Sequence, residues 1–214
     1  MRTDELIDAL TADLSPAPAR RVPQLLAAAA AGGAVVALGL VAAWLGFRPD
    51  LATALASKLF WMKAAYAAAG GGAGYLALER LARPAGSGRL GFGLAAVAAL
   101  ALVALGVAQL ASAAPGARLA LWLGGSWRQC PAYILALAAP MLVLVLLATR
   151  RLAPTRLVSA GAAAGLLCGG VAATVYGLHC GETAPAFVAT WYSLGMALST
   201  AVGGFAGAWA LRWR

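Results

Sequence analysis

The stretch 157–178 reads LVSAGAAAGLLCGGVAATVYGL, and it decides the fold class of this chain. It contains no charged residue and is long enough to cross a bilayer, because a membrane-spanning helix needs about 20 apolar residues. The apolar residues follow one another without the alternation that is typical of strands in membrane β-barrels. Since lipid accepts only helices or closed barrels, this stretch predicts a transmembrane helix.

Five similar stretches occur elsewhere in the chain, so six transmembrane helices are expected. The six cover about 24–46, 59–78, 91–114, 131–148, 157–178 and 188–211. The chain is 63% hydrophobic and 11% charged, whereas soluble domains carry about 25% charged residues. A soluble core is therefore excluded. The expected fold class is an all-α polytopic membrane protein, with the lipid bilayer as its surroundings.

The basic residues predict how the chain is oriented in the membrane. Of the sixteen Lys and Arg, eleven lie in one alternating set of segments: Arg2, Arg20, Arg21, Arg80, Arg83, Arg89, Arg150, Arg151, Arg156, Arg212 and Arg214. The other set holds Arg48, Lys58, Lys63, Arg118 and Arg128. Basic residues are enriched on the cytoplasmic side, so both termini are expected in the cytoplasm. The net charge of +9 thus orients the protein, and no direct contact with nucleic acid is expected.

Residues 1–19 are expected to form a cytoplasmic tail that is distinct from a membrane domain spanning 20–214. A short amphipathic helix is predicted in the tail, with Thr3 as its N-cap and with Pro16 and Pro18 beyond its end. Its apolar face would hold Leu6, Ile7 and Leu10, and its acidic face Asp4, Glu5 and Asp8. Such a short helix is marginal in water. The segment is therefore either a disordered tail or a helix that docks into a groove of a basic protein.

Two cysteines carry the most informative chemistry in the sequence. Cys130 opens the fourth apolar stretch and Cys180 follows the fifth, each beside a short polar loop. A short inner turn joins these two stretches, so they are expected to be antiparallel neighbours whose outer ends lie close together. Cys130 would sit at a helix N-terminus beside Arg128, and both features lower the pKa of a thiol.

Three states of the pair are compatible with the sequence. A disulfide forms in an oxidising compartment if the two Cα atoms lie within about 7 Å. A metal could bind Cys130, Cys180 and His179, with Glu182 nearby, although the spacing matches no standard zinc motif. Two unpaired thiols are the third possibility.

The remaining polar residues do not indicate catalysis. Lys58 and Lys63 lie in the outer part of the second stretch and are expected to snorkel to the interface. Cys168 lies inside the fifth stretch, where burial in apolar surroundings makes a thiol inert. No enzymatic activity and no cofactor are expected. The alternatives are a small transporter or scaffold subunit whose Lys63 and outer loops contact a substrate, and a membrane thiol oxidoreductase, which the absence of a Cys-x-x-Cys motif disfavours.

The chain resembles the NrsF family, the bacterial negative regulators of sigma-F, which are integral-membrane anti-sigma factors. The resemblance rests on the opening MRTDELIDAL (1–10), the six apolar stretches, the two outer cysteines and the segment WYSLG (191–195). It implies a multi-pass protein of the bacterial inner membrane. Such a protein holds an extracytoplasmic-function sigma factor on the cytoplasmic side and releases it under heavy-metal or oxidant stress.

The resemblance also implies roles for particular residues. Cys130 and Cys180 would be the sensor, with His179 and Glu182 as possible auxiliary groups. The tail would bind the sigma factor through Asp4, Glu5, Leu6, Ile7, Asp8 and Leu10.

Overall fold

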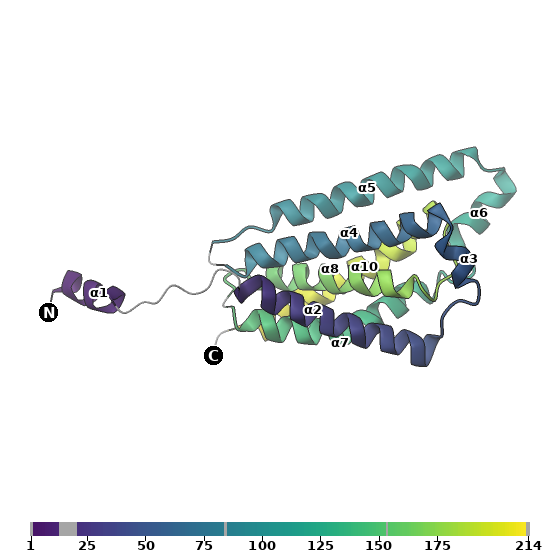
Figure 1. Cartoon of the computed structure of the whole chain (residues 1–214). Coiled ribbons are helices and arrows are strands. Elements are labelled where there is room, and N and C mark those ends of the chain that lie inside the picture. Colours follow the sequence, from purple (N-terminus) through teal and green to yellow (C-terminus); the bar gives the residue numbers. More distant parts are fainter. Residues whose placement is uncertain (1, 13–20, 84, 153, 213–214) are drawn as a thin grey trace.

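A computed structural model describes residues 2–12, 21–83, 85–152 and 154–212, and every regular element in these ranges is a helix. The long elements are α2 (Arg21–Leu40) with the π-helical turn η1 (Val41–Leu45), α4 (Lys58–Leu81), α5 (Arg89–Ser112), α7 (Cys130–Arg150), α8 (Leu157–Tyr176) and α10 (Ser193–Ala210). The short ones are α1 (Thr3–Ala12), α3 (Leu51–Leu55), α6 (Pro115–Leu123), α9 (Pro185–Phe187) and the π-helical turn η2 (Val188–Tyr192). The six long elements form one bundle, as Figure 1 shows.

Five elements are long and apolar enough to cross a membrane: Val22–Leu45, Arg89–Ser112, Cys130–Arg150, Leu157–Tyr176 and Pro185–Ala210. They coincide within a few residues with five of the six predicted stretches. The sixth prediction, 59–78, lies inside α4, which is 24 residues long. Two lysines, an acidic residue and a run of glycines make α4 less apolar than the other five. Large apolar side chains also point outward from the bundle, Val97, Leu100 and Phe205 among them. These features indicate a membrane protein.

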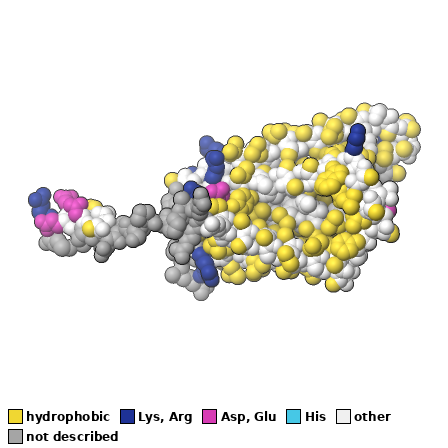
Figure 2. Space-filling model, in the orientation of Figure 1, with side chains coloured by type: hydrophobic (Ala, Val, Ile, Leu, Met, Phe, Trp, Pro, Cys, Tyr) yellow, Lys and Arg dark blue, Asp and Glu magenta, His cyan; other side chains and the backbone are white. Residues whose placement is uncertain are grey.

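Consecutive long helices run in opposite directions, so the connecting segments gather at two ends of the bundle (Figure 1). We call the end that holds residues 82–83, 85–88, 151–152 and 154–156 the basic end, since Arg80, Arg83, Arg89, Arg150, Arg151 and Arg156 lie in or beside these segments. The opposite end holds residues 46–57, 113–129 and 177–184, and we call it the cysteine end. In Figure 2 dark-blue basic side chains are visible at the left end of the bundle, while hydrophobic side chains cover much of its length.

Helix α8 lies at the centre of the bundle, and glycines on both of its sides let neighbouring backbones touch it. A Cβ added at Gly165 would overlap the carbonyl oxygen of Ser199 in α10. On the other side, a Cβ at Gly170 would overlap the backbone nitrogen of Gly71 in α4. The sequence pattern Gly161-x-x-x-Gly165-x-x-x-Gly169 thus serves the close helix approach that small-residue ridges allow.

Helix α5 is held mainly near its two ends. Gly91 contacts α4 so closely that a Cβ would lie 2.7 Å from the Cβ of Ala77, and Gly106 contacts Ala186 of α9 in the same way. Between these contacts an apolar groove of about 790 Å³ opens among α4, α5, α8 and α10.

Helix α1 begins at Thr3 itself, one residue earlier than predicted. The backbone N–H of Arg2 donates to the carboxylate of Glu5 at 2.9 Å, which is one half of a capping box. The side chains of Asp4, Glu5, Ile7 and Asp8 are exposed. The side chains of Leu6 and Leu10, and the predicted helix end at Pro16 and Pro18, lie outside the described residues.

The glycine contacts of α4 can be tested with a matched pair of variants. A Cβ at Gly74 would overlap the backbone of Leu167, whereas a Cβ at Gly72 would meet nothing within 4 Å. We expect Gly74→Ala to lower the free energy of unfolding by about 1–3 kcal/mol, because the helices must separate. Gly72→Ala should leave it unchanged or raise it by up to about 1 kcal/mol through helix propensity. Unfolding midpoints of the purified protein in one detergent check this, and equal midpoints would contradict the backbone contact.

Candidate functional site

The segment 177–184, here called the Cys180 loop, connects α8 to α9 and carries three of the predicted site residues. Turns at the end of α8 start it, with the N–H groups of His179 and Cys180 donating to the carbonyl of Tyr176 at 2.9 and 3.0 Å. The loop then contacts three other parts of the cysteine end: the connection after η1, the start of α4, and the connection between α6 and α7. Its position therefore depends on all of them.

Cys130 and Cys180 both belong to the buried core of the bundle, as does Cys168. Ser126 joins the first two: its carbonyl accepts the N–H of Cys130 at 2.9 Å, and its Oγ lies 3.8 Å from the Sγ of Cys180. Both residues are almost fully buried, with 0% and 3% of their surface exposed. All three cysteines, including the buried Cys168 in α8, are free thiols in this structure.

The surroundings of Cys130 differ from the expected ones. Helix α7 does begin at Cys130, with Pro131 in its first turn. The side chain, however, is completely buried and does not face solvent. Arg128 is exposed, and its guanidinium lies over the ring of Trp127, 5.0 Å from the centroid. Burial among apolar groups therefore dominates the setting of this thiol.

His179 and Glu182 bind backbone groups of neighbouring segments. Nδ1 of His179 lies 2.8 Å from the carbonyl oxygen of Gly46, and because a carbonyl only accepts, Nδ1 carries the proton in this contact. Oε1 of Glu182 accepts the N–H of Gly125 at 2.8 Å. Within the described ranges, no three His, Cys, Asp or Glu residues are grouped so that they could hold a metal ion. Both side chains thus fasten the Cys180 loop to its neighbours.

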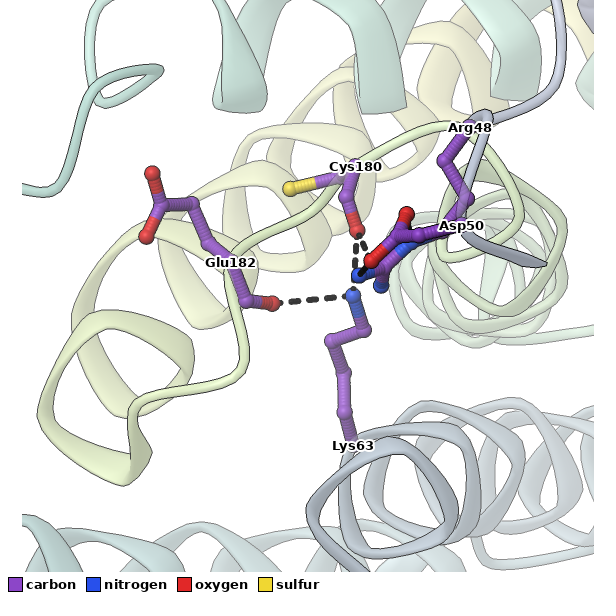
Figure 3. A network of polar contacts seen from close by, with 5 residues as sticks. All are labelled: Arg48, Asp50, Lys63, Cys180 and Glu182. Atoms are coloured by element: carbon purple, nitrogen blue, oxygen red, sulfur yellow. Dashed lines mark hydrogen bonds and ion pairs between the residues drawn. The ribbon is translucent and has the colours of Figure 1, made fainter. Parts of the chain in front are cut away.

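The prediction that Lys63 snorkels to the membrane interface is wrong. Its side chain is 1% exposed and reaches into the Cys180 loop, as Figure 3 shows. Nζ donates to the carbonyl of Cys180 at 2.8 Å and to that of Glu182 at 2.9 Å. It also lies over the ring of Tyr192, 5.4 Å from the centroid. The loop offers backbone acceptors within reach, so the ammonium is satisfied inside the protein and does not need solvent.

Arg48 also contacts the Cys180 loop. Its backbone N–H donates to the carbonyl of Leu178 at 3.0 Å, and its guanidinium lies 3.4 Å from the carbonyl of Cys180. Two further N–H groups bind the carboxylate of Asp50, each at 2.7 Å. This hydrogen-bonded guanidinium lowers the pKa of Asp50. The stabilisation by the pair is therefore present at neutral pH and is lost only as the pH falls through that lowered pKa.

The sequence did not identify Ser126, Tyr192 or Arg48 as site residues, and it indicated Lys63 only as a substrate contact of the alternative transporter. Ser126 carries no motif signal. Lys63 had one, since an ionisable residue inside an apolar stretch is by default a candidate for function. Tyr192 is fully buried, and its hydroxyl has no hydrogen-bond partner in the part of the chain that the structure describes. It lies in the segment WYSLG that carried the family resemblance.

The fold and the site define a class of protein: a helical chain with five candidate membrane spans that gathers two thiols, a buried lysine and a partly buried arginine at one end. A family model described as "Negative regulator of sigma F" (NrsF) matches residues 10–213. The chain is 52% identical over 219 residues to the anti-sigma-F factor NrsF of Caulobacter vibrioides (strain NA1000 / CB15N), with both chains fully covered. It is 38% identical over 213 residues to a probable anti-sigma-F factor NrsF of Azospira oryzae, again over both full lengths. No solved structure matches.

The chain therefore belongs to the NrsF family. This family is regulatory and non-enzymatic. The resemblance predicted from the sequence is confirmed, and so is the prediction that the chain is not an enzyme.

Proposed function

We propose that this protein is a membrane-bound anti-sigma factor that holds an extracytoplasmic-function sigma factor at the bacterial inner membrane. It releases the sigma factor when Cys130 and Cys180 sense an oxidant or a heavy metal on the outer face. The observation that carries the proposal is full-length similarity to named anti-sigma-F factors together with a cysteine pair at one end of the bundle. Residues 1–19 are the sigma-binding tail, and residues 20–214 are the membrane domain.

In this proposal α4 is the sixth membrane-spanning helix. Its 24 residues span about 36 Å at 1.5 Å per residue, enough for the hydrocarbon core. Of the two lysines in α4, Lys63 lies nearer the middle of the helix. Its ammonium is hydrogen-bonded to carbonyls of the Cys180 loop. With six crossings, the basic end lies in the cytoplasm and the cysteine end lies outside, as the distribution of arginines favours.

The cysteine pair suits a reaction that needs both sulfurs. An oxidant would accept two electrons while the thiols lose two protons and form one S–S bond. A thiophilic metal would instead displace the two protons and bind both thiolates. Either product links the side chains of Cys130 and Cys180, and this link restrains the Cys180 loop relative to the start of α7. Ser126 contacts the backbone N–H of Cys130 and the sulfur of Cys180, and this proximity of the two residues supports a shared reaction.

The acidic tail suits a partner with a basic surface. Asp4, Glu5 and Asp8 are exposed on α1, and Ile7 is 53% exposed. Sigma factors bind DNA phosphates through basic surfaces, so an acidic helix can cover such a surface while its apolar residues enter an adjoining groove. Leu6, Ile7 and Leu10 are the residues that we assign to that groove.

Topology is the first test of the proposal. Reporter fusions at Arg83 and Arg150 should behave as cytoplasmic, and fusions at Gly116 and Gly181 as external. The comparison uses a reporter pair active on opposite sides of the membrane. One clear reversal among the four sites would separate the cysteine end from the outer face and remove the sensing model.

Signalling through the cysteines is tested with single and double variants. Cys130→Ala, Cys180→Ala and the double variant should give the same defect in a sigma-dependent reporter, because the reaction needs both sulfurs. Cys168→Ala is the matched control. It should respond normally, with a packing loss of about 1 kcal/mol at most. Additive or opposite effects of the two single variants would count against a shared reaction.

The tail is tested with a synthetic peptide of residues 1–22 and the cognate sigma factor. Leu6→Asp or Leu10→Asp should abolish binding, because a charge would have to enter an apolar groove. Asp4→Asn should weaken binding modestly, mainly through slower association at low salt. Affinities from calorimetry and rates from surface binding check both effects. Unchanged affinity after the leucine substitutions would move the binding site to the connections at the basic end.

A further inference from the structure

The ammonium of Lys63 is the point where helix α4 holds the Cys180 loop. Its partners are the carbonyl oxygens of Cys180 and Glu182, two residues apart in the loop, at 2.8 and 2.9 Å. The ring face of Tyr192 lies on a further side, 5.4 Å from Nζ. In Figure 3 the lysine reaches up from α4 toward these two carbonyls, while the Cys180 sulfur points away from the ammonium.

The charge of Lys63 is balanced by dipoles and not by a carboxylate. No ion pair formed by the described residues includes it, and the carboxylate of Glu182 is engaged by the N–H of Gly125. Burying an ammonium is unfavourable unless hydrogen bonds replace its water. Here these bonds come from loop carbonyls just beyond the C-terminal end of α8, where the helix dipole also favours a cation.

This arrangement ties the burial of the charge to the conformation of the loop. Two carbonyls converge on one nitrogen only while residues 180–182 keep their present course. The side chain also lies along the end of α8, where a Cβ added at Gly177 would sit 3.6 Å from Cε of Lys63. If the loop moved outward, the ammonium would lose both acceptors at once. The lysine therefore favours the closed loop strongly.

We propose that Lys63 is a positioning residue that acts as a latch: it holds the Cys180 loop closed and keeps the Cys180 thiol shielded beside Ser126 and Cys130. Reagents reach this thiol when the contacts of Lys63 with the loop carbonyls break. The regulatory meaning of the latch rests on the proposed function, because only a sensing role makes thiol access a control point. The latch itself is a property of the fold.

The latch also connects the two cysteines to a helix that contains neither of them. Cys130 begins α7 and Cys180 follows α8, whereas Lys63 belongs to α4, which ends at the basic end. A reaction at Cys180 that shifts the carbonyl of this residue changes a bond to α4 directly. Loop closure and the position of α4 are thus linked through one side chain.

The test measures thiol access in the full-length protein in native membrane vesicles. N-ethylmaleimide is added for timed intervals, the reaction is stopped, the protein is denatured, and the remaining thiols are labelled with an isotopic form of the reagent. Mass spectrometry then gives the alkylation rate of each cysteine separately. The variants are Lys63→Met, which keeps length without charge, Lys63→Arg, which restores donors, and Lys58→Met as control. Lys58 is exposed on the same helix.

Lys63→Met should raise the alkylation rate of Cys180 about tenfold, as expected when two buried hydrogen bonds that oppose local opening are lost. Lys63→Arg should bring the rate back toward that of the unmodified protein, and Lys58→Met should not change it. Cys168 should stay slow in every variant. An unchanged rate at Cys180 in Lys63→Met would overturn the latch. So would an equal rise at Cys168, because it would mean that Lys63 supports the whole bundle and not the loop.

The assay is independent of the sigma factor. A failure of the cysteine variants in the reporter would leave the alkylation result intact. Slow alkylation of Cys180 in Lys63→Met would overturn the latch but would not contradict the proposed anti-sigma function.

Discussion

Direct backbone contact along α8 is the constraint on which the rest of the structure depends. Gly165 and Gly170 face different neighbours, and at each a single added carbon would overlap the main chain of α10 or α4. Helices that meet in this way gain dispersion contacts, which matter in lipid because apolar burial gives no advantage there. They also lose the freedom to slide that flexible side chains provide. These contacts fix the position of α8 along its axis relative to α4 and α10. They therefore also fix the point where the Cys180 loop begins.

The polar groups of the cysteine end bind the loop that follows α8. The last four carbonyls of α8 accept the N–H groups of residues 177–180, so the acceptors that remain open are those of the loop itself. Lys63, Arg48 and the backbone N–H of Gly125 come from three different segments and bind this one loop. The polar groups at this end therefore mainly fix the position of the loop. The two thiols themselves are buried in the core. This arrangement fits a regulator better than a catalyst.

Most of the helical layout could be predicted from the sequence because it follows from local composition. Apolar length defined the long helices within a few residues. What could not be predicted depends on distant partners. Lys63 has the same local appearance whether it reaches solvent or a buried loop, and only the position of the Cys180 loop decides between them. For Ser126 the signal is absent from the sequence altogether, since its role comes from lying between Cys130 and Cys180. The short helices α3 and α6 have only five and nine residues and lie in connections that were expected to be loops.

The π-helical turn η2 has a consequence for how this chain can change over evolutionary time. A π turn holds about one residue more than an α turn, so the helix before it and the helix after it are offset in register. Before the turn, the N–H of Ala186 binds Oε1 of Gln109 in α5. After it, Ser193 pairs with Tyr66 of α4 at 2.5 Å, and Ser199 meets α8. Losing one residue here would rotate one half against the other by about 100°. The spacing between Ala186 and Ser199 is therefore fixed in length, and lineages of this protein should keep it.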